Sequence, residues 1–485
     1  MLLSAIVLPV LGAALLFALR LGRARLRDGL VMAVTLLTSA LVAWCLFTPG
    51  DHAFTLLRVT EHLTVSFRLD GLGRVFGGLV GLLWPIATLY GLEYMRHEGG
   101  ENSFFGFYLL SYSATLGLAF SEDLMTLYVF FELLTLSTLP LVTHGMHARN
   151  VYAGRKYLYY LMGGEALGFI SLMAVVHYSG SSNFHYGGIP ALLAAPLSVV
   201  LPMFVLGFFG FGAKAAVFPL HGWLPTASVA PTPVTALLHA VAVVKAGAFA
   251  VIRLAYSCYP PELLRGTWAQ ELCLAFAAGT IVIGSVLAVK EPHLKRRLAY
   301  STMSNLSYVL FGAMLLTPAG LRGGLLHLVF HALMKITLFC CAGAVLVRIG
   351  KSYVADLRGL AGRMPFVCGV FLFSAVELVG IPPFIGFQST WALAVAGVSE
   401  GGPLALAGVG ALILSAILTV VYLLAPAVSA YAPPPLPLAD TEQGDCDPGL
   451  SMKLALGALC AVMLALAFFS GPLARYLTAV AGGAI

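Results

Sequence analysis

The chain has 485 residues, of which 60% are hydrophobic and only 10% are charged, and its mean hydropathy is +0.93. Soluble domains contain roughly 25% charged residues, so this composition excludes a soluble protein and indicates a polytopic membrane protein. The formal net charge of +6 does not indicate nucleic-acid binding, because membrane proteins concentrate basic residues in their cytoplasmic loops.

Apolar runs of roughly 17–25 residues predict an all-α polytopic fold with fourteen transmembrane spans in a single membrane domain, residues 1–485. The first run lacks a basic leading region and a clear cleavage site, so we interpret it as a retained helix. The predicted spans cover residues 2–19, 29–47, 73–95, 103–120, 122–143, 156–178, 197–221, 233–255, 271–289, 296–316, 322–347, 365–393, 403–428 and 451–473.

Two connections have a composition of their own. Residues 48–70 alternate apolar and polar side chains, which predicts a short external hairpin. Residues 433–448, PPPLPLADTEQGDCDP, predict an extended surface loop. The eight cysteines show neither CxxC nor Cys/His ligand spacing, so no metal site is predicted.

Most of the 27 basic residues lie in the odd-numbered connections between predicted spans. The positive-inside rule therefore predicts that these connections are cytoplasmic and that both termini lie outside. Three basic residues lie well inside the predicted spans, away from the first and last few residues of each: Lys214, Lys245 and Lys335.

Ionisable residues inside the predicted spans are candidates for function, because a charge at the bilayer centre costs about 3 kcal/mol on insertion scales. Glu132 lies in the middle of the run LMTLYVFFELLTLSTLPLV, and Lys214 begins a proline-rich stretch. The alternatives are a protonated Glu132 that only packs and a Lys214 that is its structural counter-ion. Glu165 is a further candidate, and its alternative is a packing carboxyl beside Gly163 and Gly164.

Histidines and lysines predict a proton pathway. His327, His331 and Lys335 recur every four residues and therefore share one helical face, which indicates a wet, proton-passing surface. Zinc is the weaker interpretation, because no carboxylate or cysteine completes a ligand set there and Lys335 would oppose a cation. His239 and Lys245 are six residues apart, so either a bulge aligns them or they face different neighbours.

Prolines predict breaks in two spans, at Pro219 and at Pro382–Pro383. Glu377 precedes the second break by five residues, as Lys214 precedes the first. Matched breaks in two halves are typical of inverted repeats. We therefore predict N-terminal helices in 1–95, a first five-helix repeat in 103–255, a second in 271–428 and a last helix in 451–473. Asp123, at a span edge, is either a site residue or a simple interface residue.

The segments KAAVFPLHGWLPTASVAPTPVTALLHA, LLHLVFHALMK and VGIPPFIGF resemble the antiporter-like, proton-translocating membrane subunits of respiratory complex I, membrane-bound hydrogenases and multisubunit cation/proton antiporters. The resemblance extends from the third span to the thirteenth. It implies a fourteen-helix fold with broken helices seven and twelve, a half-channel in each repeat and a polar axis between them.

The resemblance also implies roles for particular positions. Glu132 matches the fifth-helix glutamate, and Lys214 matches the seventh-helix lysine that pairs with it. Lys245 and His239 match eighth-helix residues, and Glu165 matches a sixth-helix carboxylate found in part of the family. The eleventh-helix residues are His327, His331 and Lys335.

One position departs from the family pattern. Where a lysine or glutamate usually follows the second break, this sequence has Thr390, which cannot hold a charge. We hypothesise that Glu377 or Lys335 replaces it as the terminal group. The alternative is that the chain has lost conduction and is a scaffold.

The sequence thus predicts a proton-translocating subunit, with sodium as an alternative ion, in a prokaryotic cell membrane. It contains no flavin, nucleotide or cluster motif, so no cofactor is expected in this chain. Expected partners are other antiporter-like subunits and a redox module with flavin, iron–sulfur or nickel–iron centres, as in oxidoreductase complexes. A cation/proton antiporter without redox partners is the remaining alternative.

Overall fold

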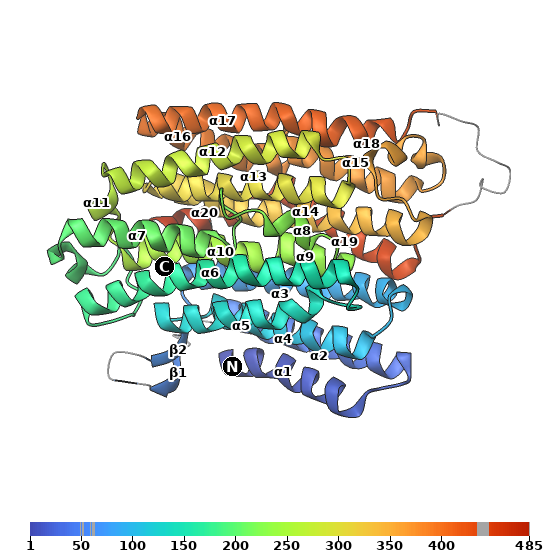
Figure 1. Ribbon diagram of the computed structural model, residues 1–485, viewed down its shortest axis with the longest axis horizontal. Coiled ribbons are helices and arrows are strands. Elements are labelled where there is room, and N and C mark those ends of the chain that lie inside the picture. The colour runs from blue at the N-terminus through green and yellow to red at the C-terminus, as the bar shows by residue number, and fades with distance from the viewer. Residues whose placement is uncertain (49, 51–52, 59, 61–63, 434–445, 485) are drawn as a thin grey trace.

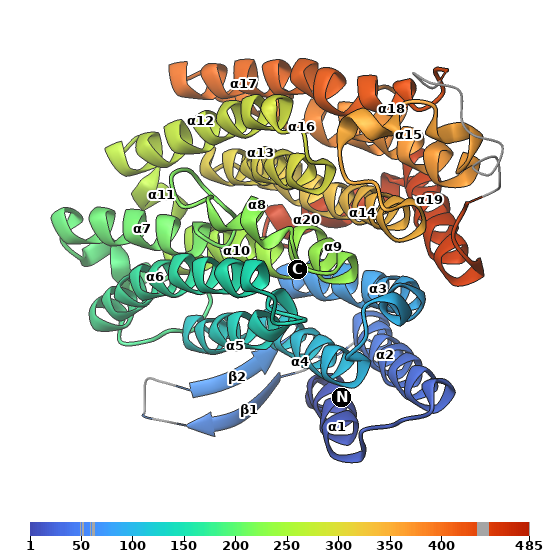
Figure 2. The same cartoon turned by 45° about the vertical axis from the view of Figure 1, so that its right-hand side comes forward.

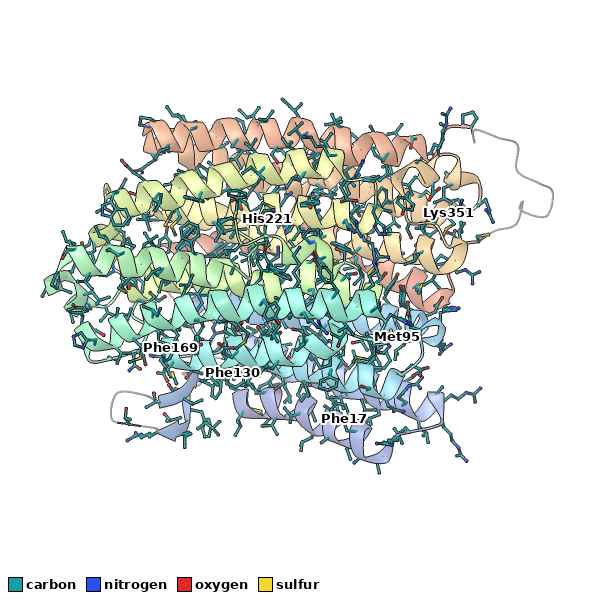
Figure 3. All side chains as sticks on the ribbon, viewed as in Figure 1. Phe17, Met95, Phe130, Phe169, His221 and Lys351 are labelled. Atoms are coloured by element: carbon teal, nitrogen blue, oxygen red, sulfur yellow. The ribbon has the colours of Figure 1, made fainter. Side chains whose placement is uncertain are left out.

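The chain folds into a bundle of helices that run back and forth along one direction, with a two-stranded hairpin at one end (Figure 1). The computed structural model describes residues 1–485 except 49, 51–52, 59, 61–63, 434–445 and 485. We call the end with the hairpin the hairpin end. Figure 3 shows Lys351 toward the opposite end and His221 partway along the bundle.

The uninterrupted long helices are α1 (Leu2–Leu19), α2 (Ala24–Phe47), α3 (Gly71–Tyr94), α4 (Glu101–Ala119), α5 (Leu124–Val142), α6 (Ala148–Ser179), α12 (Trp268–Lys290), α13 (Leu294–Met314), α14 (Pro318–Ile349) and α19 (Leu450–Phe469). The remaining α-helices are α7 (Leu197–Gly212), α8 (Trp223–Ala227), α9 (Thr232–Ala240), α10 (Val243–Arg253), α11 (Pro261–Leu264), α15 (Pro365–Val379), α16 (Ile385–Glu400), α17 (Pro403–Thr419), α18 (Ala425–Ser429) and α20 (Gly471–Ala481). Shorter 3-10 and π segments are η1 (Met95–His97), η2 (Pro190–Ala194), η3 (Leu254–Cys258), η4 (Val354–Leu357), η5 (Leu360–Gly362) and η6 (Val420–Leu424).

Ten helical segments in the described part of the chain are long and apolar enough to cross a membrane, judged by length and composition. The protein is therefore a mostly helical, polytopic membrane protein. The count of fourteen spans and the two inverted repeats remain predictions. The predicted hairpin is confirmed: β1 (Ala53–Arg58) pairs antiparallel with β2 (Thr64–Arg68).

Side-chain caps determine where several helices begin. The carboxylate of Asp70 accepts a hydrogen bond from the backbone N–H of Gly73 at 2.8 Å, at the start of α3. Asp123 caps α5 in the same way, through the backbone N–H of Thr126 at 2.7 Å. Such caps satisfy N–H groups that have no partner inside the helix.

Both predicted helix breaks are present. The chain leaves regular α-helix between α7 and α8, around Pro219, and between α15 and α16, around Pro382 and Pro383. A proline has no N–H for the helical ladder and its ring clashes with the preceding turn, which disfavours continuation of the helix through these two segments.

A third interruption, which the sequence analysis only raised as an alternative, separates α9 from α10. The backbone N–H groups of Val241 and Ala242 both donate to the carbonyl of Leu237, at 3.0 and 2.9 Å. The second of these bonds spans five residues, which is the pattern of a π-type bulge. The predicted single span over 233–255 is therefore two helices with a bulge between them.

The most enclosed helices are those with the predicted histidines and lysines. The spanning window within Thr232–Cys258 is 100% buried and that within Pro318–Ile349 is 78% buried, compared with 39% for Leu2–Leu19. Figures 1 and 2 show α10 and α14 surrounded by other helices. Because the bundle encloses these helices, their polar side chains avoid the lipid.

The C-terminal end of the chain differs from the prediction. The predicted last span over 451–473 ends at Phe469, and a further helix, α20, follows it and packs against α14. The hydroxyl of Tyr186 donates to the carbonyl of Ala481 at 2.7 Å, which holds the end of α20 near the hairpin end.

Candidate ion pathway

The first polar cluster consists of Lys214, in the turn that follows α7, Glu165 on α6 and Glu132 on α5. The Lys214 ammonium lies 2.8 Å from the Glu165 carboxylate, and both side chains are 1% exposed. The ammonium also donates to the backbone carbonyl of Phe131 and lies 3.4 Å from the centroid of its ring. Lys214 is thus held by a carboxylate, a carbonyl and an aromatic face.

Glycines allow Glu165 to approach Lys214 closely. A Cβ atom on Gly164 would lie 2.5 Å from the Cβ of Ala213, and one on Gly210 would collide with the backbone of Gly168. Small residues at a crossing let two transmembrane helices approach. The packing role considered for Gly164 is therefore present, and its effect is to bring the neighbouring carboxylate onto Lys214.

The direct partner of Lys214 differs from the predicted one. Glu132 is partly buried and accepts a hydrogen bond from the hydroxyl of Tyr128 at 2.6 Å. It also interacts with Glu165. Because Glu165 occupies the position beside the ammonium, it and not Glu132 forms the ion pair in this structure.

The α14 row consists of His327, His331 and Lys335, as the sequence predicts for one helical face. The His327 and His331 rings stack with centroids 5.7 Å apart. Nδ1 of His331 is hydrogen-bonded to the ammonium of Lys245 on α10. The structure therefore brings Lys245 onto the α14 row, which the spacing in the sequence does not reveal.

His239 and Lys245 face different residues of α14. The His239 ring lies 4.8 Å from the ring of Phe339, centroid to centroid. Neither ring nitrogen of this buried histidine has a hydrogen-bond partner among the described residues. The bulge between α9 and α10 thus separates the two side chains instead of aligning them.

Lys335 is fully buried and contacts hydroxyl and carbonyl oxygens. Its ammonium donates to the hydroxyl of Ser301 at 2.7 Å and to the backbone carbonyl of Leu298 at 3.3 Å, both on α13. Within the described residues, no carboxylate lies within ion-pair distance of it.

The second helix break differs from the first in its chemistry. Glu377 is fully buried, and one carboxylate oxygen accepts the backbone N–H of Ile385 at 3.0 Å, across the break. Thr390 is partly buried, but its neighbour Ser389 is buried and bonds Nδ1 of His327 at 3.0 Å. The resemblance to the family singled out Thr390, but in the structure α16 presents Ser389 to the α14 row.

Asp123 lies apart from these groups. Its carboxylate accepts the hydroxyls of Ser66 and Thr126 at 2.7 Å each, besides capping α5. These bonds connect the hairpin to α5, so the geometry fits the interface alternative.

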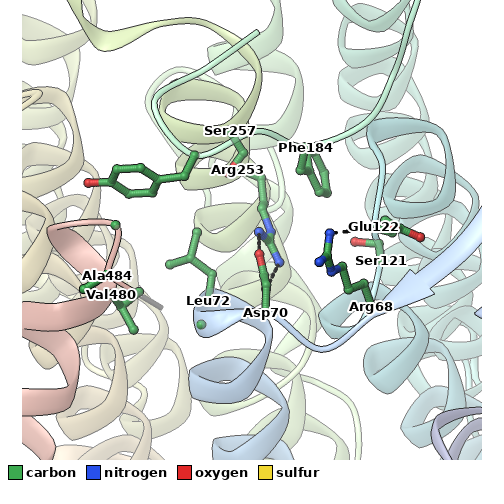
Figure 4. A pocket seen from close by; sticks show the side chains of 13 residues that line it. Arg68, Asp70, Leu72, Ser121, Glu122, Phe184, Arg253, Ser257, Val480 and Ala484 are labelled. Atoms are coloured by element: carbon green, nitrogen blue, oxygen red, sulfur yellow. Dashed lines mark hydrogen bonds and ion pairs between the residues drawn. The ribbon is translucent and has the colours of Figure 1, made fainter. Parts of the chain in front are cut away.

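A polar cavity at the hairpin end was not anticipated. Its volume is about 270 Å³, and Arg253 and Asp70 face each other in it (Figure 4). Arg253 is 1% exposed and forms two hydrogen bonds to Asp70, which is 38% exposed. Burial raises the pKa of Asp70, but the charge and hydrogen bonds of Arg253 outweigh it and leave the pKa below its usual value.

No group of three or more histidine, cysteine, aspartate or glutamate side chains in the described ranges has a geometry that fits a metal ion. The buried titratable groups are instead the first polar cluster and the α14 row, with lysines and histidines next to hydroxyls, carbonyls and a carboxylate. Such groups bind and release protons.

Comparisons with known proteins identify the family of this chain. Residues 121–417 match the family described as NADH:quinone oxidoreductase/Mrp antiporter, TM. NADH-quinone oxidoreductase subunit N of Desulforudis audaxviator (strain MP104C) is 34% identical over 375 residues, which cover 74% of this chain and 73% of that protein. Hydrogenase-4 component B of Escherichia coli (strain K12) is 33% identical over 349 residues, 68% of this chain. The alignment covers 51% of that protein, so the chain spans about half the length of this relative.

A solved structure is similar over the whole chain. A chain in respiratory complex I from Thermus thermophilus with bound NADH superposes with a TM-score of 0.83 and 26% sequence identity, covering 100% of this chain and 98% of that one. The family match at 121–417 contains the first polar cluster, the α14 row and both proline breaks.

Proposed function

Because the chain belongs to the NADH:quinone oxidoreductase/Mrp antiporter transmembrane family, we propose that it is the proton-translocating membrane subunit of a multisubunit complex. Its relatives come from quinone-reductase and hydrogenase systems, and its structural neighbour is a subunit of respiratory complex I. Other antiporter-like membrane subunits are its expected partners. A redox module with flavin, iron–sulfur or nickel–iron centres would supply the driving reaction.

The observation that best supports the proposal is the buried ion pair between Lys214 and Glu165, next to Glu132 and beside a broken helix. Purely structural counter-charges would match one lysine with one carboxylate. Here a second carboxyl group, Glu132, interacts with the ion pair, so with all three groups ionised the cluster has a net charge of −1. One added proton makes it neutral, and a cluster of this kind is suited to taking up and releasing a single proton.

The first polar cluster lies close to Lys245, the next lysine, because α10 packs against the segment that contains Lys214. A Cβ on Gly247 of α10 would lie 2.8 Å from the Cβ of Lys214, so α10 crosses directly over the break. Lys245 is two residues from Gly247 and bonds His331. A change in how strongly the carboxylates hold Lys214 therefore alters the electrostatic field at Lys245, and such effects are strong where water is excluded.

In the proposed cycle, a neighbouring subunit displaces Lys214 from its carboxylates. The altered field then drives proton transfer between Lys245 and the α14 row, whose members are His327, His331 and Lys335. Transfer from an ammonium to a neutral imidazole needs a direct hydrogen bond or one water, and the contact of Lys245 with His331 provides the former.

The test is proton translocation by the assembled complex in liposomes, measured per copy of this chain. We expect Lys214→Ala to abolish translocation in complexes that still assemble, and the exposed Lys351→Ala control to pump like the wild type. Normal pumping by Lys214→Ala would refute the proposal. The scaffold alternative predicts loss of assembly with an unchanged rate in whatever complex forms. Varying sodium at fixed pH separates proton from sodium transport.

The type of complex is tested by its composition. Purification through a tag on this chain should bring down other membrane subunits together with a redox module. Recovery of membrane subunits alone would favour a cation/proton antiporter without redox partners.

A further inference from the structure

A chain of buried hydroxyl groups leads from Lys335 across the bundle to α17. The Lys335 ammonium donates to Ser301 on α13 at 2.7 Å, and the hydroxyl of Ser301 lies 2.7 Å from that of Tyr422. The Tyr422 hydroxyl in turn lies 3.0 Å from Oγ1 of Thr419. All four side chains are at most 2% exposed.

These contacts are unusual because they start at a buried ammonium without a carboxylate partner among the described residues. A buried polar group needs hydrogen-bond partners, but one serine would satisfy that need. The further bonds to Tyr422 and Thr419 extend the network to a helix on another side of α13. Tyr422 lies in the π segment Val420–Leu424, and such wide turns are frequent at functional sites.

We propose that Ser301, Tyr422 and Thr419 form a proton relay that connects Lys335 to α17, a role that rests on the proposed proton translocation. It gives the second half of the protein a proton route that does not need a charged residue at Thr390. The relay thus adds to the proposed function the groups that follow Lys335 in the proton route.

The proton balance of the relay is simple. The Lys335 ammonium gives a proton to the oxygen of Ser301, which passes its own proton to the oxygen of Tyr422. In this structure Oγ1 of Thr419 donates to the Tyr422 hydroxyl, so this bond must first reverse by rotation of the two hydroxyl groups. Tyr422 then passes its proton to Thr419, and Thr419 releases its proton to water in the assembled complex. One proton enters and one leaves, each hydroxyl keeps one proton, and rotation of the hydroxyls restores the starting orientation.

The chain contains a matched control for this relay. Ser285, Ser304 and Ser415 form a second hydroxyl cluster between α12, α13 and α17, with oxygens 2.7 to 3.0 Å apart. All three are fully buried, but their hydroxyl groups bond one another and not Lys335. Ser285→Ala therefore removes a buried interhelical hydroxyl of the same kind outside the relay.

The experiment measures proton translocation by the assembled complex in liposomes, per copy of this chain. We expect Ser301→Ala and Tyr422→Phe to slow translocation by about tenfold or more, because a positioned proton-transfer group contributes roughly 10²–10⁴-fold. Ser301→Thr keeps the hydroxyl and should restore most of the rate. Ser285→Ala should pump like the wild type.

The outcomes separate this inference from the proposed function. If Lys335→Ala does not pump but Ser301→Ala and Tyr422→Phe match Ser285→Ala, the relay is wrong and the proposed function stands. If Lys335→Ala pumps normally, the proposed use of the α14 row fails with it. Reduced amounts of complex with an unchanged rate per complex would show that the hydroxyls only hold helices together, which overturns the relay.

Discussion

The ion pair between Lys214 and Glu165 predicts that Glu165→Gln is far more harmful to stability than Glu132→Gln. At the observed separation of 2.8 Å, two unit charges attract by about 6 kcal/mol with an effective dielectric constant of about 20. Desolvation of the two groups offsets much of that attraction. Removing only the carboxylate, however, leaves a buried ammonium without its counter-charge, which costs about 3–5 kcal/mol.

Two further variants make the magnitude specific. In the Lys214→Met, Glu165→Gln double variant both charges are absent, so most of the destabilisation of Glu165→Gln should disappear. Glu132→Gln keeps an oxygen that accepts from Tyr128, and its carboxylate is partly exposed, so we expect a cost of about 1 kcal/mol or less.

The assay measures the unfolding free energy of the purified wild type, the single variants and the double variants in mixed detergent micelles. These free energies are combined in double-mutant cycles. The cycle should give a larger coupling energy between positions 165 and 214 than between 132 and 214. Equal couplings, or a double variant no more stable than Glu165→Gln, would refute the pairing deduced from the contacts.

Three shorter predictions concern other contacts. Asp70→Asn should destabilise the protein by at most about 3 kcal/mol, since Arg253 loses its buried counter-charge while Asp70 is 38% exposed. Because the pKa of Asp70 is lower in the folded protein than its ordinary value of 3.8, ionised Asp70 stabilises the fold above pH 3.8, and this stabilisation is lost as the pH falls below 3.8. The unfolding free energy of Asp70→Asn should therefore depend less on pH in that acid range. The Glu377 side chain accepts the backbone N–H of Ile385 at the start of α16, and Glu377→Gln keeps an oxygen for that bond, so its unfolding free energy should stay within about 1 kcal/mol of wild type. Glu377→Leu removes the bond and should cost more. Equal losses for the two variants would contradict the capping role. Ser389→Ala should slow proton translocation more than Thr390→Ala, because the Ser389 hydroxyl bonds a histidine of α14; the reverse order would contradict this geometry.

Much of the architecture follows from local chemistry that a sequence displays. Long apolar runs must form helices in lipid, because every backbone polar group needs an internal partner. A proline removes a bond from the helical ladder, and the breaks at Pro219 and at Pro382–Pro383 were predicted on that ground. Single prolines are tolerated elsewhere, since Pro9, Pro85, Pro140 and Pro202 lie inside α-helices. The shared face of His327, His331 and Lys335 follows from the helical period alone.

Pairing between helices depended on the tertiary structure. Glu165 and Glu132 both lie within predicted spans, and only the close crossing of α6 and α7 at Gly164 and Gly210 shows which one meets Lys214. A residue spacing has meaning only within one regular helix, so the bulge at Val241–Ala242 made the six-residue separation of His239 and Lys245 uninformative.

The same limit explains the groups that the sequence analysis did not find. Ser389 differs from Thr390 by one position, or about 100° around a helix, and the packing of α16 on α14 determines which of the two faces His327. Serine and threonine are too common in apolar helices for the hydroxyl chain from Ser301 to be visible in a sequence. The sequence by itself determined most of the helices, the two breaks at prolines and the ionisable residues that the helices contain, because these depend on neighbours along the chain. Only the tertiary structure decided which of those residues touch, because that depends on how closely separate helices approach.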